Sequence, residues 1–296
     1  MQVGDFLDRG TQEVECILLL CKLARQAKDV GGAVVILWGN HEIMNSIGYF
    51  KYSEDANMSW SKYFGDLLTR QKGYGWLNRY IGWEKRYRVF SRENNDKTAD
   101  PARWAMMEPG SPLSVPFLSK LKVMVKVGRT VFVHAGFTAN DVIDHSNGKG
   151  ISGLNQVGTN WILKKCQSDY RYGRPRTPKD HDICWRRDYS FPPNREPCNV
   201  EEIKSMVDKA LKIVDADRMV VGHTVQRTIN SVLDGKVWRI DTGYRNPCAV
   251  LEITRIAPAK NHNDDGIDES KLSNIPTTNE LATVLEYKNT TACQKE

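Results

Sequence analysis

The sequence predicts a layered α/β fold, and two observations lead to this prediction. A helical pattern over residues 11–30 is followed by a short apolar segment at 33–38, as expected for a helix that leads into a buried strand. Polar residues directly follow several apolar segments, which is typical of sheets that carry a site at the carboxyl ends of their strands. With 296 residues, 40% of them apolar and 26% charged, the chain is long enough to bury a core, and this composition excludes collagen-like, coiled-coil and wholly disordered proteins.

The first elements are expected to form a strand–helix–strand unit. Acidic side chains lie near the start of the 11–30 helix, basic ones lie near its end, and two glycines follow it. The segment 33–38, AVVILW, is rich in β-branched residues and is closed by Gly39 and Asn40. This pattern indicates a buried parallel strand that ends in a functional loop.

Two hairpins are predicted in the second half of the chain. Alternating runs at 121–127 and 130–134 flank a short turn. The runs at 228–233 and 236–240 flank Asp-Gly, which is a strong turn signal. The other expected elements are a helix at 200–214 and strands at 219–221 and 248–253.

One domain is expected over residues 1–254. Within it, residues 49–116 are rich in aromatic and basic side chains without a sheet period, so they are predicted to form a helical insertion. Residues 255–296 are mostly polar and are expected to form a partly disordered tail that contains a short strand or helix near its end.

Charge and hydropathy limit the partners. The formal net charge of +6 is mild and evenly spread, and no RNA-binding module is detectable, so no nucleic-acid partner is expected, whereas an anionic substrate would suit the basic surface. No apolar run approaches the ~20 residues that a bilayer crossing requires, so no membrane partner is expected. The chain is expected to be soluble and cytoplasmic by default, and organellar targeting stays open because a longer product could carry a signal.

The chemistry is expected in four short blocks that place Asp, Asn or His at the ends of apolar segments. The blocks are GDFLDRG (4–10), GNHE (39–42), VHAG (133–136) and GHT (222–224). A pair of divalent cations about 3.5 to 4 Å apart needs a bridging carboxylate, further oxygen ligands and neutral imidazoles, and it clamps a phosphoryl group. The residues that fit this requirement are Asp5, Asn40, His134 and His223.

These blocks resemble those of the calcineurin-like metallophosphoesterases, and within that family those of the phosphoprotein phosphatases. GDxxDRG is followed about thirty residues later by GNHE, then by a strand-end His and a later Gly-His, in the matching order over roughly residues 1–253. The HAG and GHT blocks, GNHEIMN, and VVGHT followed by DGKVWRIDTG are most similar to the Shewanella-like protein phosphatases. The resemblance implies a layered β-sandwich flanked by helices and makes residues 1–254 a metallophosphoesterase domain.

The resemblance also implies a cofactor, two divalent cations of manganese, iron or zinc. Asp5 would bridge both cations, and Asn40, His134 and His223 would complete the second site. Asp241, in the IDTG segment, would hold a metal-bound histidine in place or would be an ordinary turn carboxylate, and both interpretations stay open.

Catalytic residues follow from the same resemblance. Asp8 would orient His41, which would protonate the leaving alkoxide, because a neighbouring carboxylate raises the pKa of an imidazole and fixes its tautomer. Arg9 and the arginine of a WxR block would bind the phosphate oxygens. In the segment WRR, Arg187 occupies that position and Arg186 is the alternative.

The family's first block, GDxHG, is absent from the sequence. That block would close the first strand and supply an Asp and a His to the first cation. We therefore expect a fold that lacks its first strand, a chain truncated at its N-terminus and an incomplete first metal site, because loss of ligands lowers metal affinity steeply.

Three functional interpretations stay open. The first is a dinuclear-metal phosphoprotein phosphatase that hydrolyses phosphomonoesters of a phosphoprotein or phosphopeptide by attack of metal-bound hydroxide. The second is a truncated, inactive pseudophosphatase that binds phosphorylated partners. The third is a diadenosine polyphosphate hydrolase. The residues do not distinguish Ser/Thr from Tyr specificity, and they indicate no oligomeric state.

Overall fold

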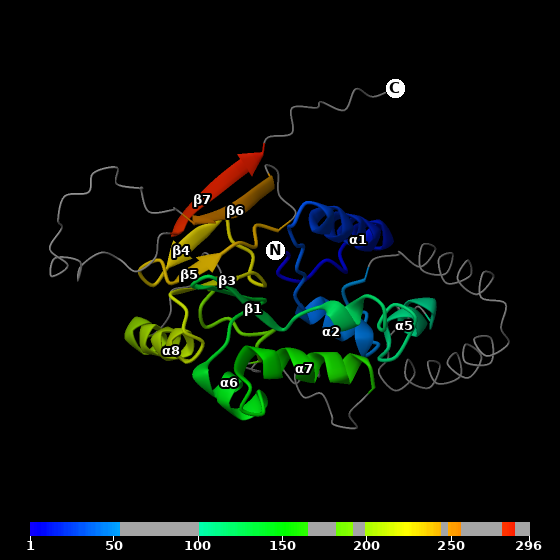
Figure 1. The fold of residues 1–296 in the computed structure, drawn as a ribbon, viewed down its shortest axis with the longest axis horizontal. Coiled ribbons are helices and arrows are strands. Elements are labelled where there is room, and N and C mark those ends of the chain that lie inside the picture. Colours follow the sequence, from blue (N-terminus) through cyan, green and yellow to red (C-terminus); the bar gives the residue numbers. More distant parts are fainter. Residues whose placement is uncertain (54–100, 165–181, 192–198, 244–247, 256–279, 288–296) are drawn as a thin grey trace, which may run out of the picture.

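The computed structural model describes six stretches of the chain, which form a mixed α/β fold with helices around a central sheet (Figure 1). This arrangement confirms the predicted fold class. None of the helices in these stretches has the length and apolar composition that spanning a bilayer would require. The described residues are 1–53, 101–164, 182–191, 199–243, 248–255 and 280–287.

The central sheet has five strands in the order β1-β2-β3-β5-β4. Strands β1 and β2 pair antiparallel, β3 is parallel to both β2 and β5, and β4 pairs antiparallel with β5. Both predicted hairpins, β1–β2 and β4–β5, are thereby confirmed. The strands are β1 (Met124–Val127), β2 (Thr130–Val133), β3 (Arg218–Val221), β4 (Asn230–Val232) and β5 (Val237–Arg239).

The N-terminal segment extends this sheet through isolated bridges. Gln2 pairs with Ile36, and Leu37 pairs with Lys122, each in parallel orientation. The predicted strand at 33–38 is therefore a short bridging segment centred on Ile36 and Leu37. Helix α1 (Glu13–Asp29) connects the two parallel segments, as the predicted strand–helix–strand unit requires.

Helices cover the sheet and provide the rest of the core. In Figure 1, α6, α7 and α8 lie together on one side of the sheet, and α2 and α5 lie beside each other. Buried side chains of α8 (Val207, Ala210, Leu211) and of β3 (Met219, Val221) belong to one hydrophobic core. The helices are α2 (Asn40–Ser46), α5 (Pro101–Met107), α6 (Ala139–His145), α7 (Gly150–Ile162) and α8 (Val200–Ile213), with a 3₁₀ turn at Leu118–Lys120.

The predicted helix at 200–214 is confirmed as α8, whereas α6 and α7 were not expected. Helix α6 has a clear local signal, because Thr138 and Asp141 form a reciprocal capping box at its start. Helix α7 contains several glycines, which disfavour helices, so packing stabilises it rather than propensity. Gly153 is required there because a Cβ would overlap the carbonyl group of Ser146.

Strands β6 (Cys248–Arg255) and β7 (Glu280–Tyr287) form a separate antiparallel pair over their whole length. The predicted strand at 248–253 is confirmed, and the element expected near the C-terminus is a strand. Most of the predicted insertion, 54–100, lies outside the described residues, and so do 256–279 and 288–296 of the predicted tail. The described part of the insertion includes α5.

Candidate metal and phosphoester site

The four predicted metal ligands meet in one place. Nε2 of His134 lies 3.3 Å from Oδ2 of Asp5 and 3.0 Å from Oδ1 of Asn40. Nδ1 of His223 lies 2.8 Å from the same Asn40 oxygen. Ligand atoms of Asp5, His134 and His223 all lie within 4.8 Å of one another. Residues that are up to 218 positions apart in sequence therefore form one polar cluster.

Sheet topology explains this convergence. His134 directly follows β2, and His223 follows β3 after one glycine, and these two strands are parallel. Asp5 and Asn40 follow the parallel bridge between Gln2 and the 36–37 segment. Because the carboxyl ends of parallel strands lie at the same edge of a sheet, all four side chains are brought to that edge.

Two glycines allow the backbones at this edge to approach each other. A Cβ on Gly39 would lie 2.5 Å from the backbone nitrogen of Asp5, and a Cβ on Gly4 would lie 2.6 Å from the backbone nitrogen of Gly39. Both distances are shorter than real Cβ contacts. The GD and GN pairs of the sequence are therefore steric requirements for bringing Asp5 beside the start of α2.

The backbone of several site residues is strained. Asp5 (φ 59°), Asp8 (φ 70°), Arg9 (φ 58°) and His223 (φ 64°) adopt the left-handed region, although none of them is glycine. Such conformations cost on the order of 1–3 kcal/mol each and persist only where surrounding contacts hold them. These strained residues lie in two of the four blocks, GDFLDRG and GHT. The strained turns there orient side chains toward the site.

The donor set fits a divalent cation. Nδ1 of His134 lies 2.7 Å from the carbonyl oxygen of Val3, which can only accept, so the proton is on Nδ1. In the neutral form that a metal ligand requires, Nε2 of this ring directs a lone pair at two oxygens that are themselves acceptors, Oδ2 of Asp5 and Oδ1 of Asn40. A cation bound among these atoms would satisfy all of them, and imidazole with carboxylate and amide oxygens suits manganese, iron or zinc.

The surroundings shift the pKa values of the two histidines in the cluster in opposite directions. Burial, together with the charge of His134, holds the pKa of His223 well below its usual range, which keeps this ring neutral as a ligand must be. Burial would also lower the pKa of His134, but the charge of Asp5 raises it overall. For Asp5 itself, burial would raise the pKa, but the histidines, His134 foremost, lower it below the usual range.

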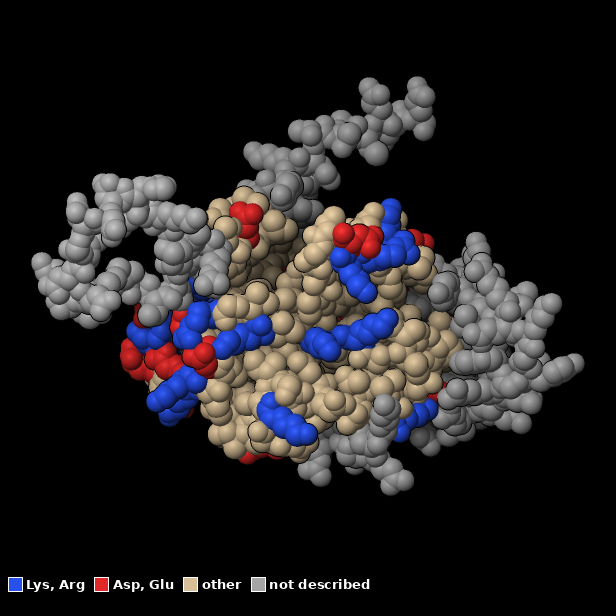
Figure 2. Space-filling model, viewed as in Figure 1, with Lys and Arg blue, Asp and Glu red and all other residues tan. Residues whose placement is uncertain are grey.

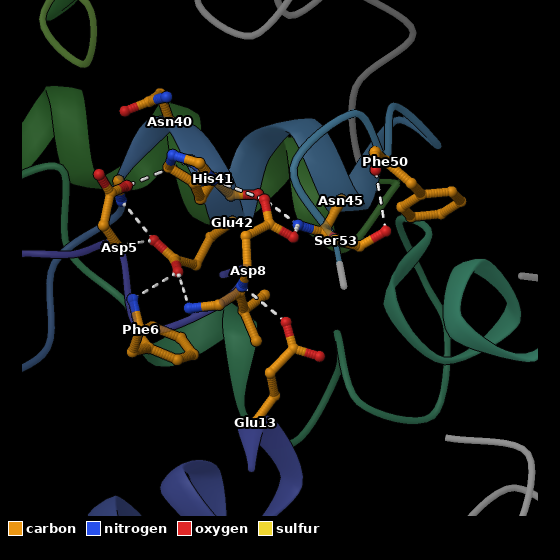
Figure 3. A network of polar contacts seen from close by, with 12 residues as sticks. Asp5, Phe6, Asp8, Glu13, Asn40, His41, Glu42, Asn45, Phe50 and Ser53 are labelled. Atoms are coloured by element: carbon orange, nitrogen blue, oxygen red, sulfur yellow. Dashed lines mark hydrogen bonds and ion pairs between the residues drawn. The ribbon is translucent and has the colours of Figure 1, made fainter. Parts of the chain in front are cut away.

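Glu42 organises the turn that carries Asp5, a role that the sequence prediction missed. Its carboxylate accepts hydrogen bonds from the backbone N–H groups of Asp5 (2.8 Å), Phe6 (2.9 Å), Leu7 (3.1 Å) and Gly39 (2.9 Å). Figure 3 shows this carboxylate pointing at the backbone of the Asp5 turn. The available signal was the position of Glu42, three residues after Gly39, where a capping glutamate is expected.

The second predicted pair, Asp8 and His41, is buried and in direct contact. Nδ1 of His41 donates to Oδ2 of Asp8 at 2.5 Å, and Figure 3 shows the two side chains facing each other. Burial would lower the pKa of His41, but the hydrogen bond to Asp8 and the charges of Asp5 and Asp8 raise it overall. This ring is therefore held with Nδ1 protonated, and Nε2 is the nitrogen that can exchange a proton with a reacting group.

A second set of residues that the sequence prediction missed lies behind this pair. Arg103 of α5 donates to Asp8 (2.9 Å), to Asn45 (2.5 Å) and to both carboxylate oxygens of Glu13. Asn45 donates in turn to Oδ1 of Asp8 (3.1 Å). These groups come from α5, α2 and α1, and no local motif links them, so sequence spacing gave no signal.

The predicted phosphate-binding arginines lie at the rim of the site. The guanidinium of Arg9 lies 5.4 Å from the ring centre of Tyr52, which also packs edge-on against His41. Arg187 donates to Oγ1 of Thr224 at 3.0 Å, next to His223. Within the described ranges, Arg187 makes this one side-chain hydrogen bond and Arg9 makes none, so both guanidinium groups have donors left for an anion.

The alternative arginine and Asp241 have other contacts. Arg186 is buried and pairs with Asp188 (2.6 Å) and Asp141 (3.3 Å), so its guanidinium is neutralised within the fold. The carboxylate of Asp241 accepts from the N–H of Gly243 at 2.8 Å. Nε2 of the candidate ligand His223 is buried and has no hydrogen-bond partner in the described part of the chain. Asp241 thus forms a turn contact rather than a hydrogen bond to a candidate ligand.

A cavity of about 590 Å³ adjoins the cluster. Its polar wall includes Asp5, Arg9, His134, His223 and Asp241, and the rest comes largely from apolar side chains of the sheet, the N-terminal segment and β6. Figure 2 shows a recess on this face between the N-terminal segment and β6. Solvent and small anions therefore have access to the Asp5 side of the cluster.

The chain is similar to several known phosphatases. The chain is 29% identical over 281 residues to Shewanella-like protein phosphatase 2 of Arabidopsis thaliana, covering 86% of this chain and 66% of that protein. It is 26% identical over 247 residues to Shewanella-like protein phosphatase 1 of Plasmodium berghei, covering 82% and 56%. A solved cold-active protein-tyrosine phosphatase of a psychrophile Shewanella species is 19% identical with a TM-score of 0.48, covering 81% and 59%.

The chain thus spans between 56% and 66% of the length of these three proteins. The family model of the calcineurin-like phosphoesterases matches residues 1–227, which include all four blocks of candidate site residues. The chain therefore belongs to the calcineurin-like phosphoesterase family.

Proposed function

We propose that the chain is a metal-dependent phosphoprotein phosphatase that hydrolyses phosphomonoesters. One observation carries the proposal: the candidate ligands Asp5, Asn40, His134 and His223 meet directly beside the buried Asp8–His41 pair. A cation site and a poised proton donor are the two parts that phosphomonoester hydrolysis needs, one for the phosphoryl charge and one for the leaving oxygen.

The cation would be held by Asp5, Asn40, His134 and His223, with Asp5 available to bridge to a second cation. Manganese, iron and zinc all suit these donors. When bound, such a cation lowers the pKa of a coordinated water and neutralises charge on the phosphoryl oxygens. The partial exposure of the Asp5 side chain, 24%, leaves room for further ligands on its cavity side.

The chain's own residues supply the remaining steps. Nε2 of His41 donates a proton to the leaving oxygen, while Asp8 holds Nδ1–H and fixes the ring. Arg9 and Arg187 bind the phosphate oxygens, because the guanidinium fork matches a tetrahedral anion. A phosphorylated side chain of a protein or peptide is the proposed substrate, supported by the names of the phosphatase relatives.

One observation favours a second candidate, a phosphate-binding pseudophosphatase. In the described stretches, a single cluster of three or more His, Cys, Asp or Glu side chains could hold a metal ion, and it contains Asp5, His134 and His223. A centre that holds one cation together with Arg9 and Arg187 would bind phosphorylated partners without turning them over.

Metal content and turnover, measured on the same sample, test the two candidates. We expect the purified chain with Mn²⁺ to release phosphate from a phosphopeptide and from p-nitrophenyl phosphate, and His41→Ala to retain Mn²⁺ but lose turnover. One equivalent of Mn²⁺, phosphopeptide binding and no phosphate release would favour the pseudophosphatase. If the chain cleaves a diadenosine polyphosphate in preference to these phosphomonoesters, the proposed substrate class is wrong and the chain is a diadenosine polyphosphate hydrolase.

A further inference from the structure

Arg103 is a buried cation that lies behind the candidate site, not within it. Its exposed fraction is 1%, and it lies on α5, which packs against the α2 helix that carries His41. An arginine is rarely buried to this extent unless specific partners hold it. Its contacts therefore indicate what it does.

The guanidinium fixes one oxygen of the Asp8 carboxylate. Nη2 of Arg103 donates to Oδ1 of Asp8 at 2.9 Å, and Nδ2 of Asn45 donates to the same oxygen at 3.1 Å. Oδ2 of Asp8 is the oxygen that holds Nδ1 of His41 at 2.5 Å. The carboxylate is thus held on one side by two donors and presents its other side to the imidazole.

Glu13 in turn holds the guanidinium in this orientation. Its carboxylate accepts from Nη1 and Nη2 of Arg103, the latter at 2.7 Å, and it also accepts from the backbone N–H of Asp8 at 2.6 Å. Nε of Arg103 donates to Oδ1 of Asn45 at 2.5 Å. A planar fork with donors on three nitrogens can make this set of contacts, whereas the single ammonium of a lysine cannot.

We propose that Arg103 is a positioning residue for proton transfer to the leaving group: it fixes Asp8, and through Asp8 it fixes the ring of His41. This inference rests on the proposed phosphatase function. Among the described residues Arg103 hydrogen-bonds to Asp8, and Asp8 hydrogen-bonds to His41, so the effect of Arg103 on the reaction passes through the orientation of the Asp8 carboxylate. Loss of Arg103 should therefore lower kcat mainly for substrates whose leaving oxygen must be protonated.

The test compares leaving groups. Phenyl phosphate needs protonation of its leaving oxygen more than p-nitrophenyl phosphate does, so the ratio of their kcat values reports on His41. We expect Arg103→Met/Glu13→Gln, which removes both buried charges and keeps an acceptor for the Asp8 N–H, to lower kcat for phenyl phosphate at least tenfold more than for p-nitrophenyl phosphate. Arg103→Lys should give an intermediate ratio.

A matched control separates positioning from stability. Leu211→Ala creates a cavity under α8, a different helix from the α2 helix that carries His41, and should lower the melting temperature while leaving the ratio unchanged. A ratio that stays at the wild-type value in both Arg103 variants would overturn the inference. Arg103→Lys keeps the charge and serves as the test variant should the double variant fail to fold.

A second readout does not depend on turnover. We expect the wild-type chain to give a low-field proton NMR signal from Nδ1–H of His41, which the double variant shifts upfield or loses and Leu211→Ala retains. An unchanged signal in the double variant would contradict the inference. If the wild-type chain cleaves neither ester, the proposed function fails, and this signal alone decides whether Arg103 positions the pair.

Discussion

Oε2 of Glu42 lies 2.8 Å from the backbone nitrogen of Asp5, so the GNHE block directly supports the turn of the GDFLDRG block. The same carboxylate also holds the N–H groups of Phe6, Leu7 and Gly39. Asp5 is therefore placed by a residue 37 positions away that is not itself a candidate ligand.

This contact makes metal affinity depend on Glu42. In Glu42→Ala the four N–H groups lose their acceptor and the strained Asp5 turn can relax, so we expect Mn²⁺ to bind about 10- to 100-fold more weakly, as is typical when a partner of a ligand is removed. Titration calorimetry measures this change. Glu15→Ala, at an exposed position of α1, should bind as the wild type does, and equal affinity in a folded Glu42→Ala would show that the turn forms without it.

Cation binding should stabilise the folded chain. A cation that binds only the folded state at 100 times its dissociation constant adds about 2.7 kcal/mol to the free energy of unfolding. We expect Mn²⁺ to raise the melting temperature, a chelator to reverse the rise, and His223→Ala to abolish it. His145→Ala, an exposed histidine on α6, is the matched control, and a full rise in His223→Ala would exclude that residue as a ligand.

The Asp8–His41 contact predicts a pH dependence. In the proposed reaction His41 is the acid, so activity should fall as the pH rises through the pKa of this ring, which the hydrogen bond to Asp8 raises above its usual value. Asp8→Asn removes the charge, so the pKa should fall and the alkaline limb of kcat should move to lower pH. Turnover should also drop by about 10²- to 10⁴-fold, the usual contribution of such proton transfer. A pH–rate profile with an unmoved limb would argue against this role.

The two adjacent arginines should behave differently. Arg187→Ala is expected to raise KM for a phosphomonoester by roughly 10- to 100-fold, because a hydrogen bond to a charged group is worth about 1.5–3 kcal/mol, with little change in melting temperature. Arg186→Ala leaves Asp141 and Asp188 without their buried partner and should destabilise the fold by about 3 kcal/mol. Steady-state kinetics and denaturant titration of both variants check the contrast, which a reversed pattern would contradict.

Much of the fold could be predicted because its signals are local. A few neighbouring residues are enough to specify three kinds of feature: a hairpin with a clear turn, an amphipathic helix such as α8, and a strand-end histidine such as His134. Helix α7 was missed because its glycines oppose helix formation, and only tertiary packing, such as the contact of Gly153 with Ser146, explains it.

The candidate ligands could also be predicted from local sequence, whereas the residues that support them could not. Each candidate ligand lies in a compact block, and parallel strands bring the blocks together. Arg103, Glu13 and Asn45 escaped prediction because each lies on a different helix and they interact only after folding. Glu42 was visible in its block, but only the structure assigns its carboxylate to the turn of Asp5.

The central claim is that Asp5, Asn40, His134 and His223 together hold a divalent cation. Anomalous diffraction from crystals grown with Mn²⁺ locates the ion directly. We expect a peak within coordination distance of Oδ2 of Asp5, Oδ1 of Asn40, Nε2 of His134 and Nδ1 of His223. A structure of the Mn²⁺-saturated chain with no peak there, or with the ion bound only by other side chains, would contradict it.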